Sequence, residues 1–174
     1  ADSISEGFFN EHHENEQNER TEQEGKLNKS PSSRVDTVYL TECGACHMAY
    51  PAGLLPKQSW RKIMSGLDDH FGDNAELDKE TVTQITIYLE KYALGGKMKT
   101  KLNKMRRNIP ANTPIRITKL PYFIHKHDEI TNKMVRANPK VKSFSHCDSC
   151  HADATKGEFD EDNVFIPGFG RWDD

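Results

Sequence analysis

The stretch CGACH at residues 43–47 recurs as CDSCH at residues 147–151, and together they contain all four cysteines of the 174-residue chain. Each stretch has two cysteines three positions apart, with a histidine directly after the second. Thiols at this spacing can form thioethers with the two vinyl groups of one porphyrin, and the adjacent histidine can then bind the iron. The repeat therefore predicts two covalently attached haem c groups. The residues expected to hold them are Cys43, Cys46, His47, Cys147, Cys150 and His151.

Two other uses of paired cysteines fit this sequence less well. A thioredoxin-like C-x-x-C lies in a βαβ setting, and a zinc ribbon places its cysteine pairs about 15 to 20 residues apart. Here 100 residues separate Cys46 from Cys147, and no β-strand pattern is convincing anywhere in the chain. Two copies that use every cysteine favour the two-haem interpretation.

The fraction of hydrophobic residues is low for a chain that must form a core. Hydrophobic residues make up 34% of the chain, and the 11 glycines bring the total to about 40%, below the ~45–50% of ordinary globular domains. Two porphyrins would supply much of the missing core, so we expect no folding without haem. The expected fold is mainly α with extensive loops, as two small c-type haem units packed around two covalently bound haems.

The charge distribution and hydropathy exclude two classes of function. No run of about 18 apolar residues is present, so no membrane-spanning helix is expected. Residues 1–35 carry four basic and eight acidic side chains, a net charge of 4 − 8 = −4, which leaves +1 for the other 139 residues. A nearly neutral body gives no argument for binding nucleic acid.

Changes in composition divide the chain into four segments. Residues 1–35 form a polar, acidic tail that is expected to be flexible. Residues 36–96 are expected to form an N-terminal haem unit and residues 108–174 a C-terminal one. Between them, residues 97–107 hold six basic side chains and no acid, which indicates a solvated linker or, alternatively, a docking strip for an acidic redox partner.

Capping signals and apolar periodicity predict three helices. Ser59 is a possible N-cap for a helix over residues 60–69, and Asp78 for a second over residues 79–93. A third helix would have a proline at its first position and cover residues 121–134.

Each iron needs a second axial ligand, and helical-wheel positions narrow the choice in the N-terminal unit. On the expected helix over residues 60–69, continued by one residue, His70 shares the apolar face with Ile63 and Leu67. His70 is therefore the first candidate, with Met64 as its competitor.

In the C-terminal unit, the same count places His127 on the apolar face and His125 on the opposite face. His146 directly precedes an attachment cysteine and is too closely tied to that loop to reach across the porphyrin. His127 is therefore the first candidate for the second haem, with Met134 as its main competitor.

Most of the chain after residue 35 resembles the DHC-type dihaem cytochrome c family. The stretches that carry the resemblance are residues 42–75 (ECGACHMAYPAGLLPKQSWRKIMSGLDDHFGDNA), 116–130 (RITKLPYFIHKHDEI), 146–159 (HCDSCHADATKGEF) and 167–173 (PGFGRWD). The resemblance implies bis-histidine ligation at both haems. The implied pairs are His47 with His70, and His151 with His127.

The resemblance also implies a function and partners. Members are small exported bacterial electron carriers, so a periplasmic location is expected, and a chain that begins at Ala1 is compatible with a removed signal peptide. The implied acceptor is an oxygen-binding, high-spin monohaem cytochrome c, and the implied donor a membrane b-type cytochrome. The expected role is electron transport, without catalysis, through low-potential haems. The alternative is a small haem enzyme or gas sensor, similar to a peroxidase, with one open or labile iron site.

Overall fold

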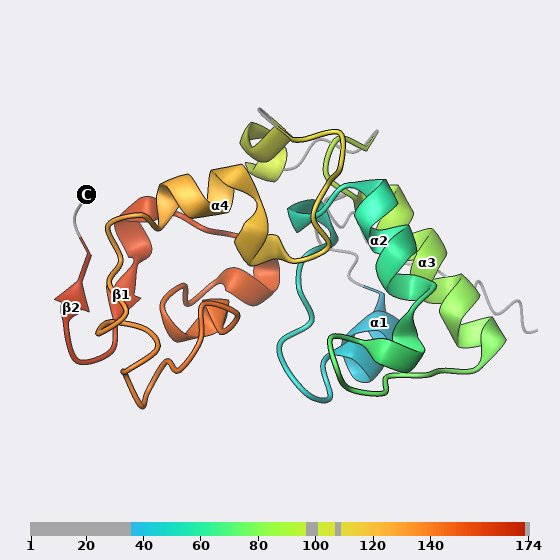
Figure 1. The fold of residues 1–174 in the computed structure, drawn as a ribbon, viewed down its shortest axis with the longest axis horizontal. Helices are drawn as coiled ribbons and strands as arrows, with labels where there is room; N and C mark the ends of the chain where they lie inside the picture. The colour runs from blue at the N-terminus through green and yellow to red at the C-terminus, as the bar shows by residue number, and fades with distance from the viewer. Residues whose placement is uncertain (1–35, 97–100, 107–108, 173–174) are drawn as a thin grey trace, which may run out of the picture.

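The computed structural model describes residues 36–96, 101–106 and 109–172. The tail over residues 1–35 and three of the six basic residues of the segment 97–107, namely Lys97, Lys99 and Arg107, lie outside this part of the chain. Helices α1 to α3 occupy one half of the molecule, and α4, β1 and β2 lie in the other half, where long loops predominate (Figure 1). The chain is thus mainly helical with extensive loops.

Helix α1, Thr37–Cys43, leads directly into the first cysteine motif. The Asp36 side chain caps it by accepting a hydrogen bond from the Tyr39 amide at 3.1 Å. At the other end, the Gly44 amide donates to the Leu40 carbonyl oxygen at 3.0 Å. A Cβ on residue 44 would lie 2.2 Å from that oxygen, so the tight turn into the motif requires glycine.

Helix α2, Lys57–Met64, differs from its predicted position at both ends. It begins after Pro56, three residues earlier than expected, and Ser59 lies inside it with its hydroxyl donating to the Pro114 carbonyl at 3.0 Å. Ser59 is therefore not the N-cap. The helix ends at Met64 because Gly66, which has high backbone freedom, follows almost at once.

Helix α3, Lys79–Tyr92, confirms its prediction to within one residue. Asp78 caps it by accepting from the Thr81 amide at 3.0 Å. It packs along α2, and Ile85 and Leu89 are at most 1% exposed. Capping and apolar periodicity agree here, and the helix forms the main wall of the core.

Helix α4, Pro121–Lys126, starts with its proline as predicted but ends eight residues before Met134. His127 follows as the C-terminal cap, and turns replace helix over residues 128–138. This stretch begins with Asp128 and continues through Thr131 and Asn132, whose side chains compete with helical backbone hydrogen bonds.

The remaining elements are short. Strands β1, Phe165–Ile166, and β2, Gly170–Arg171, pair antiparallel, a hairpin that the sequence did not predict because two residues per strand are too few for an alternating pattern. Short 3₁₀ helices are η2 Ala52–Leu54, η3 Leu67–Asp69, η4 Lys101–Arg106, η5 Ile117–Lys119, η6 Cys147–Ser149, η7 Ala154–Lys156 and η8 Glu161–Asn163. Among the described residues, no helix is both long and apolar enough to cross a membrane.

The hydrophobic core lies mostly in the N-terminal half, with Trp60 and Leu55 at its centre. The other half contributes Leu120 to the same cluster, and Phe123 and Phe159 pack against it. The two halves therefore meet through apolar side chains as well as through the chain that connects them.

Candidate haem-binding sites

Three of the four cysteines, Cys43, Cys147 and Cys150, are partly buried, whereas Cys46 is exposed. Cys43 ends α1, and Cys147 begins η6. Burial, the main cause in both cases, raises the pKa of Cys43 to about 11 and that of Cys147 to about 11. Burial also raises the pKa of Cys150. Redox-active and metal-binding cysteines instead have lowered pKa values, so these surroundings do not favour thiolate chemistry.

The structure brings His70 opposite His47. Their ring centres are 6.3 Å apart and their planes differ by 20°, so the rings face each other nearly in parallel. Nδ1 of His47 lies 2.7 Å from the Met48 carbonyl oxygen. Because a carbonyl oxygen only accepts, Nδ1 carries the proton and Nε2 keeps a free lone pair for a metal.

His70 reaches this position from a tight loop and not from a helix. Helix η3 ends at Asp69, and a tight turn follows in which Phe71 has a φ of 59°. The Gly72 amide donates to the Asp69 carboxylate at 2.9 Å, and the His70 amide donates to the Asp73 carbonyl at 2.7 Å. The helical wheel assumed that the helix over residues 60–69 continued to His70, and this assumption about the backbone was wrong.

Aromatic and charged neighbours surround His70. The ring of Phe71 meets it edge-on at 4.8 Å, and the Arg116 guanidinium lies 4.1 Å from the centre of the Phe71 ring. Burial, His47 and Arg116 lower the pKa of His70, while Asp73 opposes them. The imidazole is therefore neutral near pH 7 and able to act as a ligand.

In the other half, the structure brings His127 opposite His151. The ring centres are 6.2 Å apart, but the planes differ by 69°. Nδ1 of His127 donates to the Phe123 carbonyl oxygen at 2.8 Å, which again leaves Nε2 free. Burial lowers the pKa of both histidines, so both rings are neutral near pH 7.

The spacing of each pair fits one iron between two imidazoles. A metal–imidazole bond is about 2 Å long and the ring centre lies roughly 1 Å behind the nitrogen, so a shared metal would separate the ring centres by about 6 Å. The observed values are 6.3 Å and 6.2 Å. In both halves, one histidine of the pair directly follows a C-x-x-C motif, as haem attachment requires.

Comparison with known proteins agrees with this geometry. The family model described as dihaem cytochrome c matches residues 39–159, which is more than half of the chain. The chain belongs to the dihaem cytochrome c family. It accordingly carries two haem c groups and is a haem electron carrier.

Solved dihaem cytochromes c resemble this one in sequence and structure. The Shewanella baltica protein has 47% identity and a TM-score of 0.66, and the match covers 83% of this chain and all of the other. Two structures from Rhodobacter sphaeroides have 40% and 41% identity, with TM-scores of 0.58 and 0.63; each match covers 72% of this chain and 97% or 98% of the other. No curated protein matches.

The competing ligand candidates of this dihaem cytochrome c lie in other settings. Met64 is 7% exposed within the hydrophobic core. Met134 lies in a turn after α4, where its carbonyl accepts from the Asn138 side chain at 3.0 Å. The His125 side chain is 79% exposed, and Nδ1 of His146 donates to the Val141 carbonyl at 2.7 Å.

The aromatic residues that pack against the histidines were not predicted from the sequence. The Phe123 ring stacks on His127 with centres 3.9 Å apart, and Phe144 meets the same ring edge-on at 6.0 Å. The centre of the Phe159 ring lies 5.3 Å from that of the His151 ring. The i, i+4 spacing of Phe123 and His127 on a helix was the available signal.

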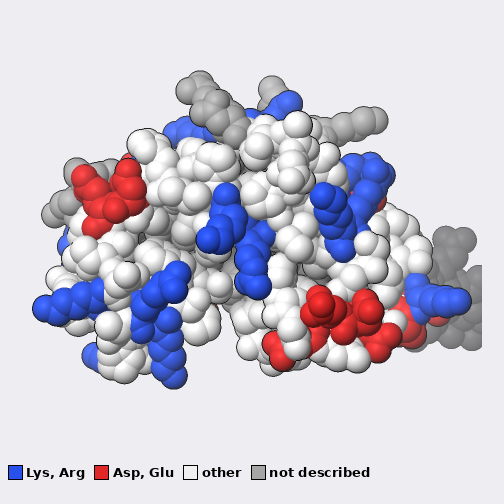
Figure 2. All heavy atoms as spheres, viewed as in Figure 1, with Lys and Arg blue, Asp and Glu red and all other residues white. Residues whose placement is uncertain are grey.

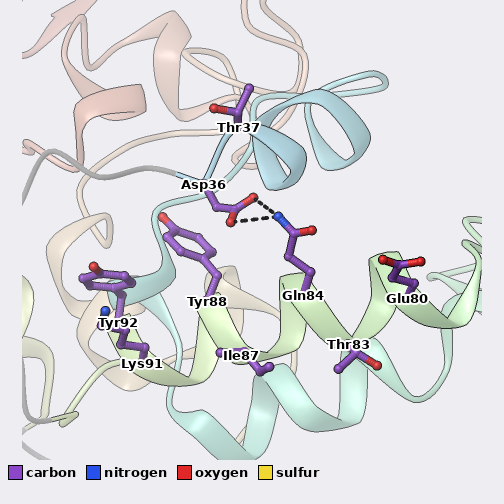
Figure 3. A pocket seen from close by; sticks show the side chains of 9 residues that line it. All are labelled: Asp36, Thr37, Glu80, Thr83, Gln84, Ile87, Tyr88, Lys91 and Tyr92. Carbon is purple, nitrogen blue, oxygen red and sulfur yellow. Dashed lines mark hydrogen bonds between the residues drawn. The ribbon is translucent and has the colours of Figure 1, made fainter. Parts of the chain in front are cut away.

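A groove on the outer face of α3 is separate from both haem sites (Figure 3). Gln84 and Ile87 line it, and the Gln84 amide donates to the Asp36 carboxylate at 3.3 and 3.4 Å. None of its lining residues is a cysteine, histidine or methionine, so it offers no haem ligand.

Proposed function

We propose that this dihaem cytochrome c is a periplasmic one-electron carrier with two bis-histidine irons. His47 and His70 are the axial ligands of the first haem, and His151 and His127 those of the second. The observation that carries the proposal is the pair of facing imidazoles beside each attachment motif, at a separation that suits one iron. The periplasmic location is supported by the resemblance to exported family members.

The haem supplies a one-electron Fe(III)/Fe(II) couple, and the protein determines what else can happen at the iron. Two imidazole ligands at each iron would leave no position there for a substrate. The hydrogen bonds from His47 and His127 to backbone carbonyls hold the rings in one orientation. A site fixed in this way changes little between oxidation states, which favours fast electron transfer.

The ligand set also indicates the range of the redox potentials. A methionine ligand raises the potential of a c-type haem, and histidine does not. Met64 and Met134 are the methionines that the sequence offers as ligands, and their surroundings favour packing and turn formation instead. We therefore expect both haems at the low end of the cytochrome c range.

For the acceptor we propose an oxygen-binding, high-spin monohaem cytochrome c, and for the donor a membrane b-type cytochrome. The family resemblance supports these partners, and the surface charge suggests how an acidic one would dock. Residues 130–147 contain four basic side chains and no acid, and all four are exposed. They are Lys133, Arg136, Lys140 and Lys142.

This basic loop lies beside the second haem site. Lys and Arg side chains gather at the lower left of the molecule, and acidic side chains gather at the lower right (Figure 2). The Asn138 side chain ties the loop to the turn between β1 and β2 by donating to the Pro167 carbonyl at 2.8 Å, and within the loop Nδ1 of His146 donates to the Val141 carbonyl. A rigid basic surface favours association with an acidic redox protein.

The absorption spectrum tests the proposed ligation most simply. We expect low-spin ferric bands from both haems and no change when carbon monoxide is added to the ferrous protein. A high-spin ferric band, or binding of carbon monoxide at either iron, would support the alternative of a haem enzyme or gas sensor with an open site.

A further inference from the structure

Tyr50 joins the first haem site to a residue just before the second attachment motif. It lies three residues after His47, and the two rings are in contact, with centres 4.9 Å apart and planes tilted by 32°. Its hydroxyl donates to the Ser145 carbonyl oxygen at 2.7 Å. Ser145 is 95 residues further along the chain and only two residues before Cys147. One side chain therefore joins the first proximal histidine to the second attachment motif.

Both ends of this contact are anchored. The Tyr50 carbonyl accepts a hydrogen bond from the Tyr39 hydroxyl at 2.5 Å, and Tyr39 is 3% exposed on α1, the helix that leads to Cys43. On the other side, the Ser145 amide donates to the Ser143 hydroxyl at 3.1 Å. Tyr50 is thus fixed to the core of one half and to an ordered turn of the other.

A neighbouring contact brings the same two segments together. Gly157, which ends η7, has a φ of 76°, and a Cβ at that position would lie 3.5 Å from the Cβ of Pro51. The residue after Tyr50 therefore lies against the chain that follows the second haem motif. Two adjacent residues form this junction, and Tyr50 provides its hydrogen bond.

We propose that Tyr50 is a positioning residue that holds the two haem-attachment motifs in a fixed relation and thereby sets the coupling between the haems. The proposal deepens the proposed electron-carrier function, because electrons exchange between haems over a separation that this junction fixes. It requires two attached haems, but it does not require bis-histidine ligation.

Replacing Tyr50 with phenylalanine removes the hydroxyl and keeps the ring against His47. The Ser145 carbonyl then loses its partner from the other half. Loss of one such hydrogen bond corresponds to about a five-fold increase in the open population of the junction. The His146 amide donates to the Ser143 carbonyl just before the second motif, and the His151 amide donates to the Cys147 carbonyl within it. We expect both amides to exchange about five-fold faster with deuterium.

The second readout is the haem–haem distance distribution of the ferric protein, measured by pulsed electron paramagnetic resonance. We expect a narrow distribution in the wild type and a broader one in Tyr50→Phe. The matched control is Tyr122→Phe, because Tyr122 is partly buried on α4 and its hydroxyl makes no hydrogen bond within the described residues. This control should leave the exchange and the distance distribution unchanged.

A second variant covers the case in which Tyr50→Phe fails to take up haem. Tyr39→Phe removes the bond to the Tyr50 carbonyl and leaves the Tyr50 hydroxyl in place. It should broaden the distribution less than Tyr50→Phe does. The proposal would be overturned if every folded Tyr50 and Tyr39 variant had the same amide exchange rates and the same haem–haem distance distribution as the wild type. High-spin iron in the wild type would instead count against the proposed ligation, and it would leave both of these readouts intact.

Discussion

The two histidine pairs have almost the same separation but different ring orientations. His47 and His70 face each other with an interplanar angle of 20°, whereas the planes of His127 and His151 differ by 69°. The C-x-x-C-H motifs on which the pairs depend share the same spacing. The motif therefore determines how each haem is attached. The orientation of the opposite histidine, His70 or His127, depends on the local structure around it, which differs between the two sites.

The packing around the second histidine explains the difference. His70 lies in a tight turn in which the next residue, Phe71, has a positive φ, and Phe71 packs edge-on against its ring. His127 instead ends α4, where Phe123 stacks on one face and Phe144 meets the ring at 90°. The plane of the His70 ring is therefore determined by a loop, and that of the His127 ring by an aromatic cluster.

Ring orientation has a consequence for the electronic structure of a low-spin ferric iron. Parallel imidazoles donate π density into the same iron orbital and separate it in energy from its neighbour. Crossed imidazoles donate into both orbitals and keep them close in energy. Since axial ligation governs haem properties, we expect the two haems to differ in their magnetic signals even with identical ligands.

The largest expected effect comes from removing one histidine of a pair. His70→Ala and His127→Ala should each create one high-spin haem that binds carbon monoxide, while the other haem stays low-spin. Absorption spectra of the ferrous protein with and without carbon monoxide measure this. The matched control is His125→Ala, because the His125 side chain is 79% exposed. Carbon monoxide binding in the control, and not in His127→Ala, would reject the proposed pair.

Loss of haem should affect the two halves unequally. The N-terminal half has a protein core in which Leu55, Ile85 and Leu89 are at most 1% exposed, and the C-terminal half lacks a comparable cluster of its own among the described residues. A Cys147→Ala, Cys150→Ala variant should lose amide protection throughout residues 109–172.

The matched variant is Cys43→Ala with Cys46→Ala, which should keep protection in α3 even without the first haem. Hydrogen exchange followed by mass spectrometry compares the two proteins. Equal loss of protection in both halves in both variants would show that the chain folds as a single unit that needs both haems.

A smaller effect is expected from the aromatic cluster around His127. Phe144→Leu removes the edge-on contact, so the His127 ring should gain rotational freedom and the magnetic signal of the second haem should broaden or shift. The signal of the first haem should not change. Phe169→Leu is the control, since Phe169 is 46% exposed. A change in the first signal only would mean that the signals, or the ring positions, are assigned to the wrong haems.

The smallest effect concerns docking. Charge reversal at Lys133, Arg136 and Lys140 should slow electron transfer to an acidic partner several-fold at low salt, and the difference should shrink as salt screens the charges. Lys62→Glu on α2 is the exposed control. Unchanged rates at low salt would remove the basic loop as a docking surface.

The strip predicted from sequence needs its own comparison. Lys99, Lys101 and Lys104 belong to the basic segment between the two halves, and their joint reversal should slow the same reaction if that segment docks the partner. If reversal in this segment slows electron transfer in a salt-dependent way and reversal in the loop of residues 130–147 does not, the docking surface is the linker and not the loop.

Local signals in the sequence predicted what depends on local interactions. The two C-x-x-C-H motifs predicted the cofactor. The N-cap Asp78 and the apolar periodicity of the residues after it predicted α3, because capping and burial act within a few residues. The backbone at His70 was mispredicted. The wheel ran through Gly66, a residue that weakens helices, and η3 and a tight loop place the histidine instead.

Other features depend on contacts between distant residues and left no local pattern. Ser59 resembled a helix cap but bonds to Pro114, 55 residues away. Likewise, Tyr50 follows the first motif as an ordinary aromatic residue, and its bond to Ser145 exists only once the two halves meet. The crossed rings at His127 need Phe144, 17 residues along the chain, and no helical pattern connects the two.

The electron paramagnetic resonance spectrum of the fully oxidised wild-type protein tests the central claim most directly. Two bis-histidine haems with different ring orientations predict two low-spin signals of equal intensity and no high-spin component. The nearly parallel pair, His47 and His70, should give a rhombic signal, and the crossed pair, His127 and His151, a more anisotropic one. A high-spin signal, or a single low-spin species that accounts for both irons, would contradict the account.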